Sequence, residues 1–260
     1  MQNSKALKWL HAIRKYELDF IIKYLPSDEN TQLLELGSGT GYQLSLLTKI
    51  YKNSTGVEIG ASQASSSQYP ILFDDIIEYD GKVLPFENET FDIIISSHVM
   101  EHIDDIDNYN KEIKRVLKDA GIVIHVLPSH TWRFWTSFWH YPLGLLMLFR
   151  LVNGYYSREE SNISSRKMLN KRKIMKNLLF SETHGVRGNP ISEIYYFSPL
   201  FWEKLFKNNN WDVIEVKKIG LLYWGRDFFQ FKIPIKTRIY LAKILGSSSV
   251  MYLLKKPTKG

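Results

Sequence analysis

An apolar run that leads into glycine at every second position constrains the fold of this chain more than any other stretch. Leu33, Leu34 and Leu36 precede Gly37-Ser38-Gly39-Thr40-Gly41, and a segment with apolar residues at helical spacing follows. This pattern predicts a strand, a tight loop and a helix, in that order. Glycine permits positive φ and lets backbone N–H groups approach a ligand, and the helix N-terminus points to the same place. We therefore expect a nucleotide-like ligand at this loop.

The spacing of the glycines argues against a dinucleotide. The fingerprint G-x-G-x-x-G needs glycine at position 42, where this chain has Tyr42, and the carboxylate of Glu35 would repel a pyrophosphate. The observed pattern, E-x-G-x-G-x-G, resembles the first motif of the class I S-adenosylmethionine (AdoMet) methyltransferases of the small-molecule type. The ligand of that family carries an amino group and a sulfonium and no phosphate. A nucleotide enzyme and a plain glycine turn are the alternatives.

The resemblance also implies how AdoMet is bound as cofactor. Glu58 ends a predicted strand and would accept hydrogen bonds from the ribose hydroxyls, while Asp80 precedes Leu-Pro-Phe and would face the adenine amino group. Asp74 and Asp75 compete for that second role. Ser97 and His98 follow a buried strand, so they should border the methyl donor at the carboxyl edge of the sheet. The predicted cofactor-binding residues are Glu35, Leu36, Gly37, Gly39, Gly41, Glu58, Ile59, Asp80, Gly81, Ser97 and His98.

Strand and helix patterns alternate from residue 32 to residue 127, which favours a parallel, doubly wound α/β sheet. Together with the resemblance, the later segments complete a mostly parallel seven-stranded sheet of the Rossmann-like methyltransferase fold, with the last strand antiparallel. The predicted strands span 54–58, 91–97, 121–127, 211–219 and 250–256, besides those near residues 33 and 77, and the predicted helices span 4–25, 104–118, 201–208 and 235–245.

The alternation stops between Pro128 and Pro190, which we interpret as a helical, aromatic-rich insertion after the fifth strand that covers the substrate. The predicted organisation is an AdoMet-binding core at 1–127, an inserted lid at 128–190 and completion of the core at 191–260. The uncharged run 134–149 contains Pro142 and Gly144, so it is too short and too broken for a membrane span. Peripheral membrane contact through 132–152 and ordinary packing with substrate lining are the two interpretations.

The charge of the chain is concentrated in the same region. The formal net charge is +7, and residues 153–190 hold eight basic and three acidic side chains. Such a segment could meet a phosphate-bearing substrate, anionic lipid or nucleic acid, or it could be a solvated helix face. Basic residues interrupt the apolar N-terminus, which therefore lacks the core of a signal peptide, and the chain has no cysteine. We expect a cytoplasmic protein that could lie peripherally at the inner membrane surface.

One motif points to a metal. His98-Val99-Met100-Glu101-His102 matches H-x-x-E-H, in which two histidines hold zinc and the glutamate acts as base. A zinc motif of this kind belongs inside a helix, whereas this one straddles a strand end and a loop. It resembles instead the H-V-x-E-H-I segment that follows the fourth strand in class I methyltransferases, so we predict no metal.

Methyl transfer from a sulfonium is an in-line displacement, and a hydroxyl acceptor benefits from a nearby base. The candidate catalytic residues are His98, His130 and His140, and His184 could reach in from the far end of the insertion. The predicted function is O-methylation of a small-molecule or glycan acceptor, which could be lipid-linked or phosphorylated. One alternative is an RNA methyltransferase, although the chain shows no N/D-P-P-Y motif and no separate RNA-binding module, which disfavours nucleic acid. The other is a catalytically silent AdoMet-fold binding protein. The acceptor atom and the oligomeric state are not predicted.

Overall fold

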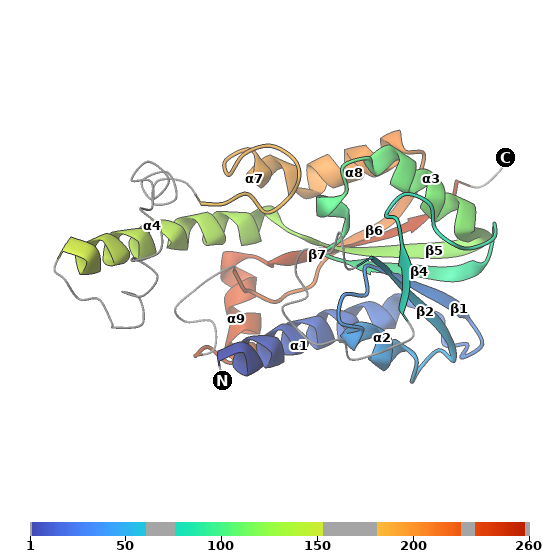
Figure 1. Cartoon of the computed structure of the whole chain (residues 1–260), viewed down its shortest axis with the longest axis horizontal. Helices are drawn as coiled ribbons and strands as arrows, with labels where there is room; N and C mark the ends of the chain where they lie inside the picture. Colours follow the sequence, from blue (N-terminus) through green and yellow to red (C-terminus); the bar gives the residue numbers. More distant parts are fainter. Residues whose placement is uncertain (1, 61–75, 153–180, 225–231, 258–260) are drawn as a thin grey trace.

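A seven-stranded sheet forms the centre of the computed structural model, which describes residues 2–60, 76–152, 181–224 and 232–257 (Figure 1). The strand order is β3-β2-β1-β4-β5-β7-β6. Strand β7 pairs antiparallel with both of its neighbours, and the other pairings are parallel. The predicted mostly parallel sheet is therefore confirmed. The strands are β1 (Gln32–Leu36), β2 (Asn53–Ile59), β3 (Ile76–Tyr79), β4 (Phe91–Ser97), β5 (Leu117–Pro128), β6 (Asp212–Lys218) and β7 (Ser249–Lys255).

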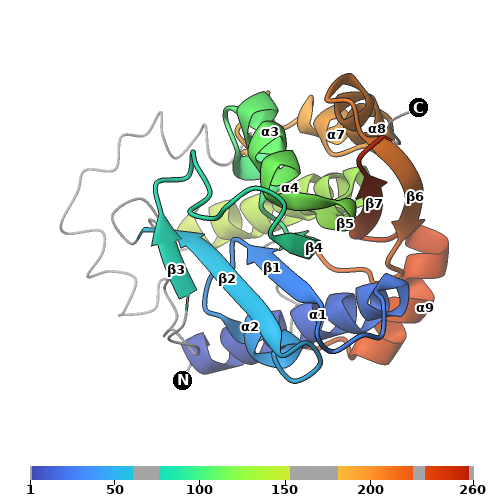
Figure 2. The ribbon, with the colours of Figure 1, turned by 90° about the vertical axis from the view of Figure 1, so that its right-hand side faces the viewer.

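Helices cover both faces of the sheet (Figures 1 and 2). One layer contains α1 (Gln2–Ile21), α2 (Tyr42–Leu47) and α9 (Ile235–Leu245), and the other contains α3 (Ile106–Val116), α7 (Glu193–Tyr196) and α8 (Pro199–Asn208). Two short 3-10 turns, η1 (Ile22–Tyr24) and η2 (Met100–His102), follow α1 and β4. The four predicted helices are present, with ends shifted by a few residues, and the strand predicted at 121–127 begins earlier, at Leu117.

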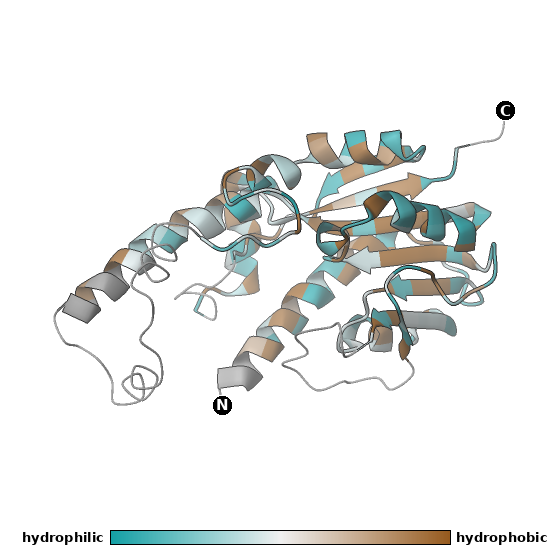
Figure 3. Cartoon of the chain, turned by 45° about the horizontal axis from the view of Figure 1, so that its top comes forward, coloured by the Kyte–Doolittle hydropathy of each residue, from teal (hydrophilic) through white to brown (hydrophobic). Residues whose placement is uncertain are grey.

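Alternation along the strands builds two cores, one on each face of the sheet. Leu34 and Leu36 of β1 pack on the side of α3 and α8, whereas Leu33 packs with Leu18 of α1 on the opposite side. Figure 3 shows hydrophobic residues gathered along the strands between the helix layers. Because side chains alternate between faces, Glu35 points to the α1 side of the sheet, at the carboxyl end of β1.

The site lies where the order of the strands in the sheet reverses, between β1 and β4. β1 and β4 are neighbours, and the chain continues from β1 toward β2 and from β4 toward β5, on opposite sides. The loops that leave these two strands diverge, which opens a crevice at their carboxyl ends. The glycine loop after β1 and the segment beginning at His98 after β4 border this crevice.

The insertion after β5 begins with α4 (His130–Val152), which extends away from the sheet (Figure 1). Pro142 lies inside this helix, which continues through it. A proline inside a helix costs about 3 kcal/mol, and packing of the preceding turns against α9 offsets this cost. Trp135 Nε1 donates to the Leu245 carbonyl at 3.1 Å, and Trp139 stacks on Trp224 at 6.0 Å. None of the described helices is long and apolar enough to span a membrane.

Several predictions concern residues outside the described ranges. These are the competing aspartates Asp74 and Asp75 and most of the basic segment, which falls in 153–180. The three-part division of the chain therefore stays a prediction, although the aromatic helix after β5 is present as expected.

Candidate active site

The glycine loop has the predicted backbone, but its N–H groups serve a different purpose from the one expected. Gly37, Gly39 and Gly41 have φ of 69°, 54° and 77°. The N–H groups of Gly37 and Ser38 donate to the Val57 carbonyl at 2.9 and 3.0 Å, and that of Gly39 donates to Glu58 Oε2 at 2.6 Å. The expectation that these donors face a ligand is therefore wrong for these three groups. Since they are engaged within the protein, the loop is a poor cradle for pyrophosphate.

Two glycines of the loop, Gly37 and Gly39, differ in the free space around them. A Cβ on Gly37 would lie 2.4 Å from Val99 Cγ2, so this glycine permits close packing of two segments. A Cβ on Gly39 would meet no described atom within 4 Å, which leaves room for a ligand over this residue.

Glu35 supplies the observation that tests whether AdoMet fits here. Its side chain is 2% exposed, and Oε2 has no hydrogen-bond partner among the described residues. Burial raises the pKa of Glu35 to about 8, and the nearby Glu58 adds to this shift. A buried carboxyl oxygen without a donor is costly, so the site favours a ligand that brings a positively charged donor. The amino group of AdoMet has this chemistry.

The other predicted cofactor residues lie at the carboxyl ends of β1, β2 and β3. Leu36 is buried in the core, so only its backbone can face a ligand. Glu58 Oε1 accepts from the Ile59 N–H at 3.0 Å. Asp80 is exposed after β3, and two backbone N–H groups of the following turn lower its pKa. Gly81, with φ 78°, brings this turn against Ile59. Their roles in cofactor binding stay predictions.

His98 is held by buried side chains at the end of β4. Its φ is 58°, an uncommon value for a non-glycine residue, and its N–H donates to the Val126 carbonyl at 2.8 Å. The ring Nε2 lies 3.2 Å from Glu17 Oε1 and 3.3 Å from the Tyr223 hydroxyl, which itself donates to Glu17 Oε1 at 2.7 Å. Ser97 Oγ is buried beside it and has no partner within the described chain.

The charges around His98 determine which ring nitrogen can accept a proton. Burial and then Arg14 lower the pKa of His98, so the imidazole is neutral near pH 7. Burial alone would raise the pKa of Glu17, but His98 and Arg14 outweigh it and hold this pKa far below its usual range. An ionised Glu17 can only accept a hydrogen bond, so Nε2 of His98 carries the hydrogen and donates to it. The free lone pair is therefore on Nδ1. This nitrogen lies 3.8 Å from Glu101 Oε1.

The other two candidate histidines lie along α4. His130 is its first residue, and burial together with Lys218 at the end of β6 lowers its pKa. His140 lies farther along the helix, with its ring T-shaped against Tyr141 at 5.6 Å. His130 follows β5, the neighbour of β4, whereas His98 directly follows β4 itself.

Sequence reasoning missed Arg14, Glu17 and Tyr223. Arg14 Nη1 pairs with Glu17 Oε2 at 2.7 Å on α1. A signal was present for Glu17, because it falls at the helical spacing of Ile13 and Ile21, both of which are buried. A carboxylate on the apolar face of a helix indicates a buried partner. No comparable pattern marks Tyr223, which follows β6.

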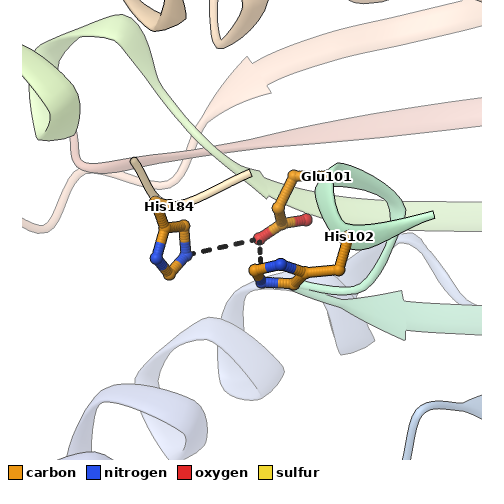
Figure 4. A group of neighbouring side chains, drawn as sticks. All are labelled: Glu101, His102 and His184. Atoms are coloured by element: carbon orange, nitrogen blue, oxygen red, sulfur yellow. Dashed lines mark ion pairs between the residues drawn. The ribbon is translucent and has the colours of Figure 1, made fainter. Parts of the chain in front are cut away.

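Glu101, His102 and His184 come together beside His98 (Figure 4). Glu101 is 1% exposed, and burial raises its pKa to about 8. The ring of His184 lies 4.6 Å from that of Trp132. Two residues of the H-x-x-E-H motif thus meet a distant histidine, and this group of three excludes the first histidine of the motif.

Comparison with known proteins identifies this arrangement. A family model described as "Methyltransferase domain" matches residues 34–125, which contain the glycine loop, Glu58 and His98. Residues 34–125 form a methyltransferase domain of the class I AdoMet-dependent type. The methyl donor of this family is AdoMet, in agreement with the chemistry of Glu35.

Curated methyltransferases match about half of the chain. Sterol 4-C-methyltransferase of Caenorhabditis elegans is 30% identical over 45% of this chain and 35% of its own length. The ubiquinone biosynthesis O-methyltransferase of Bartonella tribocorum is 24% identical over 44% of this chain and 47% of its own. Demethylmenaquinone methyltransferase of Thermotoga maritima is 26% identical over 58% of this chain and 63% of its own length. The chain therefore spans less than two thirds of the length of each relative.

Solved structures share the fold over nearly the whole chain. The complex of the Haloferax volcanii Trm112 methyltransferase activator with a candidate methyltransferase gives a TM-score of 0.55 at 16% identity, covering 96% of this chain and 93% of the other. The [4+2]-cyclase SpnF gives a TM-score of 0.50 at 14% identity, covering 92% of this chain and 79% of the other. The methyltransferase fold also occurs in a protein titled as a cyclase, so the reaction must be argued from the site.

Proposed function

We propose that this methyltransferase transfers the methyl group of AdoMet to a hydroxyl oxygen of an apolar, lipid-linked small molecule. The observation that carries the proposal is His98, whose neutral ring is fixed by Glu17 and Tyr223 at the edge of the cofactor crevice. A fixed, neutral imidazole with one free nitrogen is suited to accept the proton of a hydroxyl group.

Each side chain of the site has a separate role in the proposed methyl transfer. Glu35 binds the amino group of AdoMet, and Glu58 binds the ribose hydroxyls, while the bound cofactor supplies an electrophilic methyl group. His98 Nδ1 takes the proton of the acceptor hydroxyl as the new C–O bond forms. Glu17 stabilises the resulting imidazolium and keeps the ring oriented, the role that the carboxylate has in hydrolase triads.

An exposed apolar stripe on α4 supports an acceptor that resides in a membrane. Its side chains recur at intervals of three or four residues and therefore share one face of the helix. The stripe consists of Phe134, Phe138, Tyr141, Leu145 and Phe149, each 47% to 69% exposed. Trp135 and Trp139 point instead toward α9 and Trp224. We infer that the stripe docks the protein on a bilayer surface.

The named relatives support the apolar character of the acceptor, not the choice of atom. Their names refer to a sterol, to ubiquinone biosynthesis and to demethylmenaquinone, and the sterol enzyme is named for methylation at carbon. Sterols and isoprenoid quinones are apolar, so a protein that methylates a similar compound needs access to lipid.

Label transfer tests the proposal. The protein is incubated with methyl-labelled AdoMet and, separately, with a lipid extract, a water-soluble extract and total RNA from cells that lack its gene. We expect label in the lipid fraction. Replacement of His98→Gln should lower the rate about 100-fold or more, the usual contribution of a general base, while calorimetric AdoMet binding is kept.

The two helix histidines provide the comparison. If His130→Gln or His140→Gln abolishes transfer and His98→Gln does not, the assignment of the base is wrong. If the label enters only the RNA, the acceptor is RNA and the proposed lipid acceptor is wrong.

A further inference from the structure

The cluster of Glu101, His102 and His184 contains a buried acid without a partner. Neither carboxyl oxygen of Glu101 has a hydrogen-bond partner among the described residues, although the side chain is 1% exposed. Three ring nitrogens surround Glu101 Oε1, His98 Nδ1 at 3.8 Å and the Nε2 atoms of His102 and His184 at 3.9 Å each, all too far for a hydrogen bond. Figure 4 shows the three side chains turned toward one another. Such an arrangement suits a ligand between them.

Backbone contacts bring the distant segment of His184 to η2. The Val186 N–H donates to the Glu101 carbonyl at 3.0 Å, and Arg187 Nη2 donates to the Ile103 carbonyl at 2.8 Å. These bonds join the residues after His184 to the residues around Glu101. The three side chains are thus brought together by contacts between segments that are about 84 residues apart in the chain.

A buried ion pair fixes His184 from the other side. Glu193 Oε1 accepts from the N–H groups of His184 and Gly185 at 2.7 and 2.8 Å, and Glu193 Oε2 pairs with Arg133 Nε at 3.0 Å. Arg133 and Glu193 are 1% and 0% exposed. An ion pair shielded from solvent holds its geometry closely, so the backbone of His184 is fixed beside Glu101.

The donor set and its openness match one kind of metal site. Two imidazole nitrogens and one carboxylate oxygen, all within 4.8 Å of one another, are the three protein ligands of many catalytic zinc sites. Bonds of about 2.0–2.2 Å place neighbouring ligands roughly 3.3–3.6 Å apart around a tetrahedral ion, so a small contraction completes the site. His102 and His184 are 45% and 37% exposed, which leaves a coordination position open to solvent.

We propose that Glu101, His102 and His184 bind one divalent metal ion of the zinc class, with the open position available to the acceptor oxygen. The sequence motif argued against a metal because its residues do not share a helix. His184, which the motif does not contain, supplies the third ligand. The binding of the ion stands on this geometry alone, whereas its role toward the acceptor rests on the proposed function. A metal-bound hydroxyl loses its proton more readily, and His98 Nδ1 lies beside the cluster to receive it.

Titration of the tag-free, metal-free full chain with Co²⁺ tests the site. Four-coordinate Co²⁺ has intense visible absorption, so binding is read without AdoMet or acceptor. We expect one Co²⁺ per chain, displaced by Zn²⁺. Glu101→Gln and His184→Gln should weaken binding about 100-fold, and the matched control His140→Gln, a histidine replacement on α4, should bind as the wild type does.

Circular dichroism establishes that each variant is folded. The metal site is overturned if the wild type shows no saturable absorption, or if folded His184→Gln binds Co²⁺ as tightly as the wild type. If Co²⁺ binds but the rate of methyl transfer is equal with and without metal, the role toward the acceptor is overturned and the site itself stands. Failure of methyl transfer to any lipid leaves the titration unaffected, so the two proposals fail separately.

Discussion

The proposed role of Glu35 in binding the amino group of AdoMet opposes its contribution to the stability of the ligand-free fold. Its pKa of about 8 means that the ligand-free folded protein keeps a proton that the unfolded chain releases above its ordinary pKa of 4.5. The folded state binds more protons in this window, so the contribution of Glu35 to stability falls as pH rises from 4.5 to 8. A cationic ligand reverses this balance because it pairs with the ionised form.

Replacement of Glu35→Gln should therefore stabilise the ligand-free protein at pH 8 and weaken AdoMet binding. A hydrogen bond to a charged group contributes about 1.5–3 kcal/mol, so we expect the dissociation constant to rise roughly 10- to 100-fold. Wild-type affinity should increase from pH 6 to pH 8, and the variant should show a flat profile. Calorimetry at three pH values measures both.

A matched control is Glu29→Gln, an exposed residue that precedes β1 at the opposite edge of the sheet. This control should keep the wild-type profile. If Glu35→Gln retains the same increase of affinity with pH, Glu35 is not the group that binds the amino group.

Gly37 and Gly39 offer a second comparison between neighbouring residues. Both have positive φ, which costs an alanine about 1 kcal/mol. Gly37→Ala also forces a Cβ into Val99, so we expect a further loss of about 1–3 kcal/mol. Gly39→Ala should destabilise less but weaken AdoMet binding, because its Cβ enters the space left for the ligand. Denaturant unfolding and calorimetry separate the two effects, and equal loss of stability in both variants would contradict the close packing at Gly37.

Residues of the site differ in how far the sequence could predict them. Glu35, the glycines, Glu58 and His98 follow directly from strand ends, because a parallel sheet brings those ends to one edge. Glu17, Tyr223 and His184 reach the same place through contacts between residues far apart in the chain, which no local spacing encodes. Glu101 was visible in a motif, but its burial depends on the segment that covers it.

The helix α4 has two faces with different partners. One face, with Trp135 and Trp139, packs on α9 and Trp224, and the other carries the exposed stripe. The crowded aromatic residues in the sequence could not be divided between these faces, since apolar side chains occur on both faces and the partners on α9 lie far away in the chain. A continuous helix joins the stripe to Arg133 and thus to the segment that orients His184.

The stripe can be tested with vesicles. The double variant Phe138→Ser, Leu145→Ser removes two side chains that are 47% and 69% exposed and lie outside the buried core clusters, so folding should be kept. Burying each in the interface contributes on the order of 1 kcal/mol, and we expect the fraction sedimenting with anionic liposomes to fall about tenfold or more. Tyr240→Ser on α9, also an exposed apolar residue, is the matched control and should sediment as the wild type does. Equal sedimentation of all three proteins would reject membrane docking.

The proposed site has two halves, which meet at the end of β4. In this proposal the cofactor half comes from β1, β2 and β3, and the acceptor half comes from α1, η2 and the residues that precede α7. Strand β7 lies antiparallel between β5 and β6. The alternating pattern predicted the parallel part of this sheet, and the resemblance to the methyltransferase family supplied the antiparallel last strand. Neither predicted how the insertion returns to η2.

This division predicts how ligand binding changes the stability of the folded chain. A ligand at 100 times its dissociation constant stabilises the folded state by about 2.7 kcal/mol, which corresponds to a rise in unfolding temperature of roughly 5–10 °C. AdoMet should give this rise in the wild type and in His184→Gln, but a much smaller one in Glu35→Gln. Thermal unfolding monitored by circular dichroism, with and without AdoMet, measures it. Loss of the AdoMet shift in folded His184→Gln would show that the cofactor depends on the acceptor half, and the separation of the two halves would then be wrong.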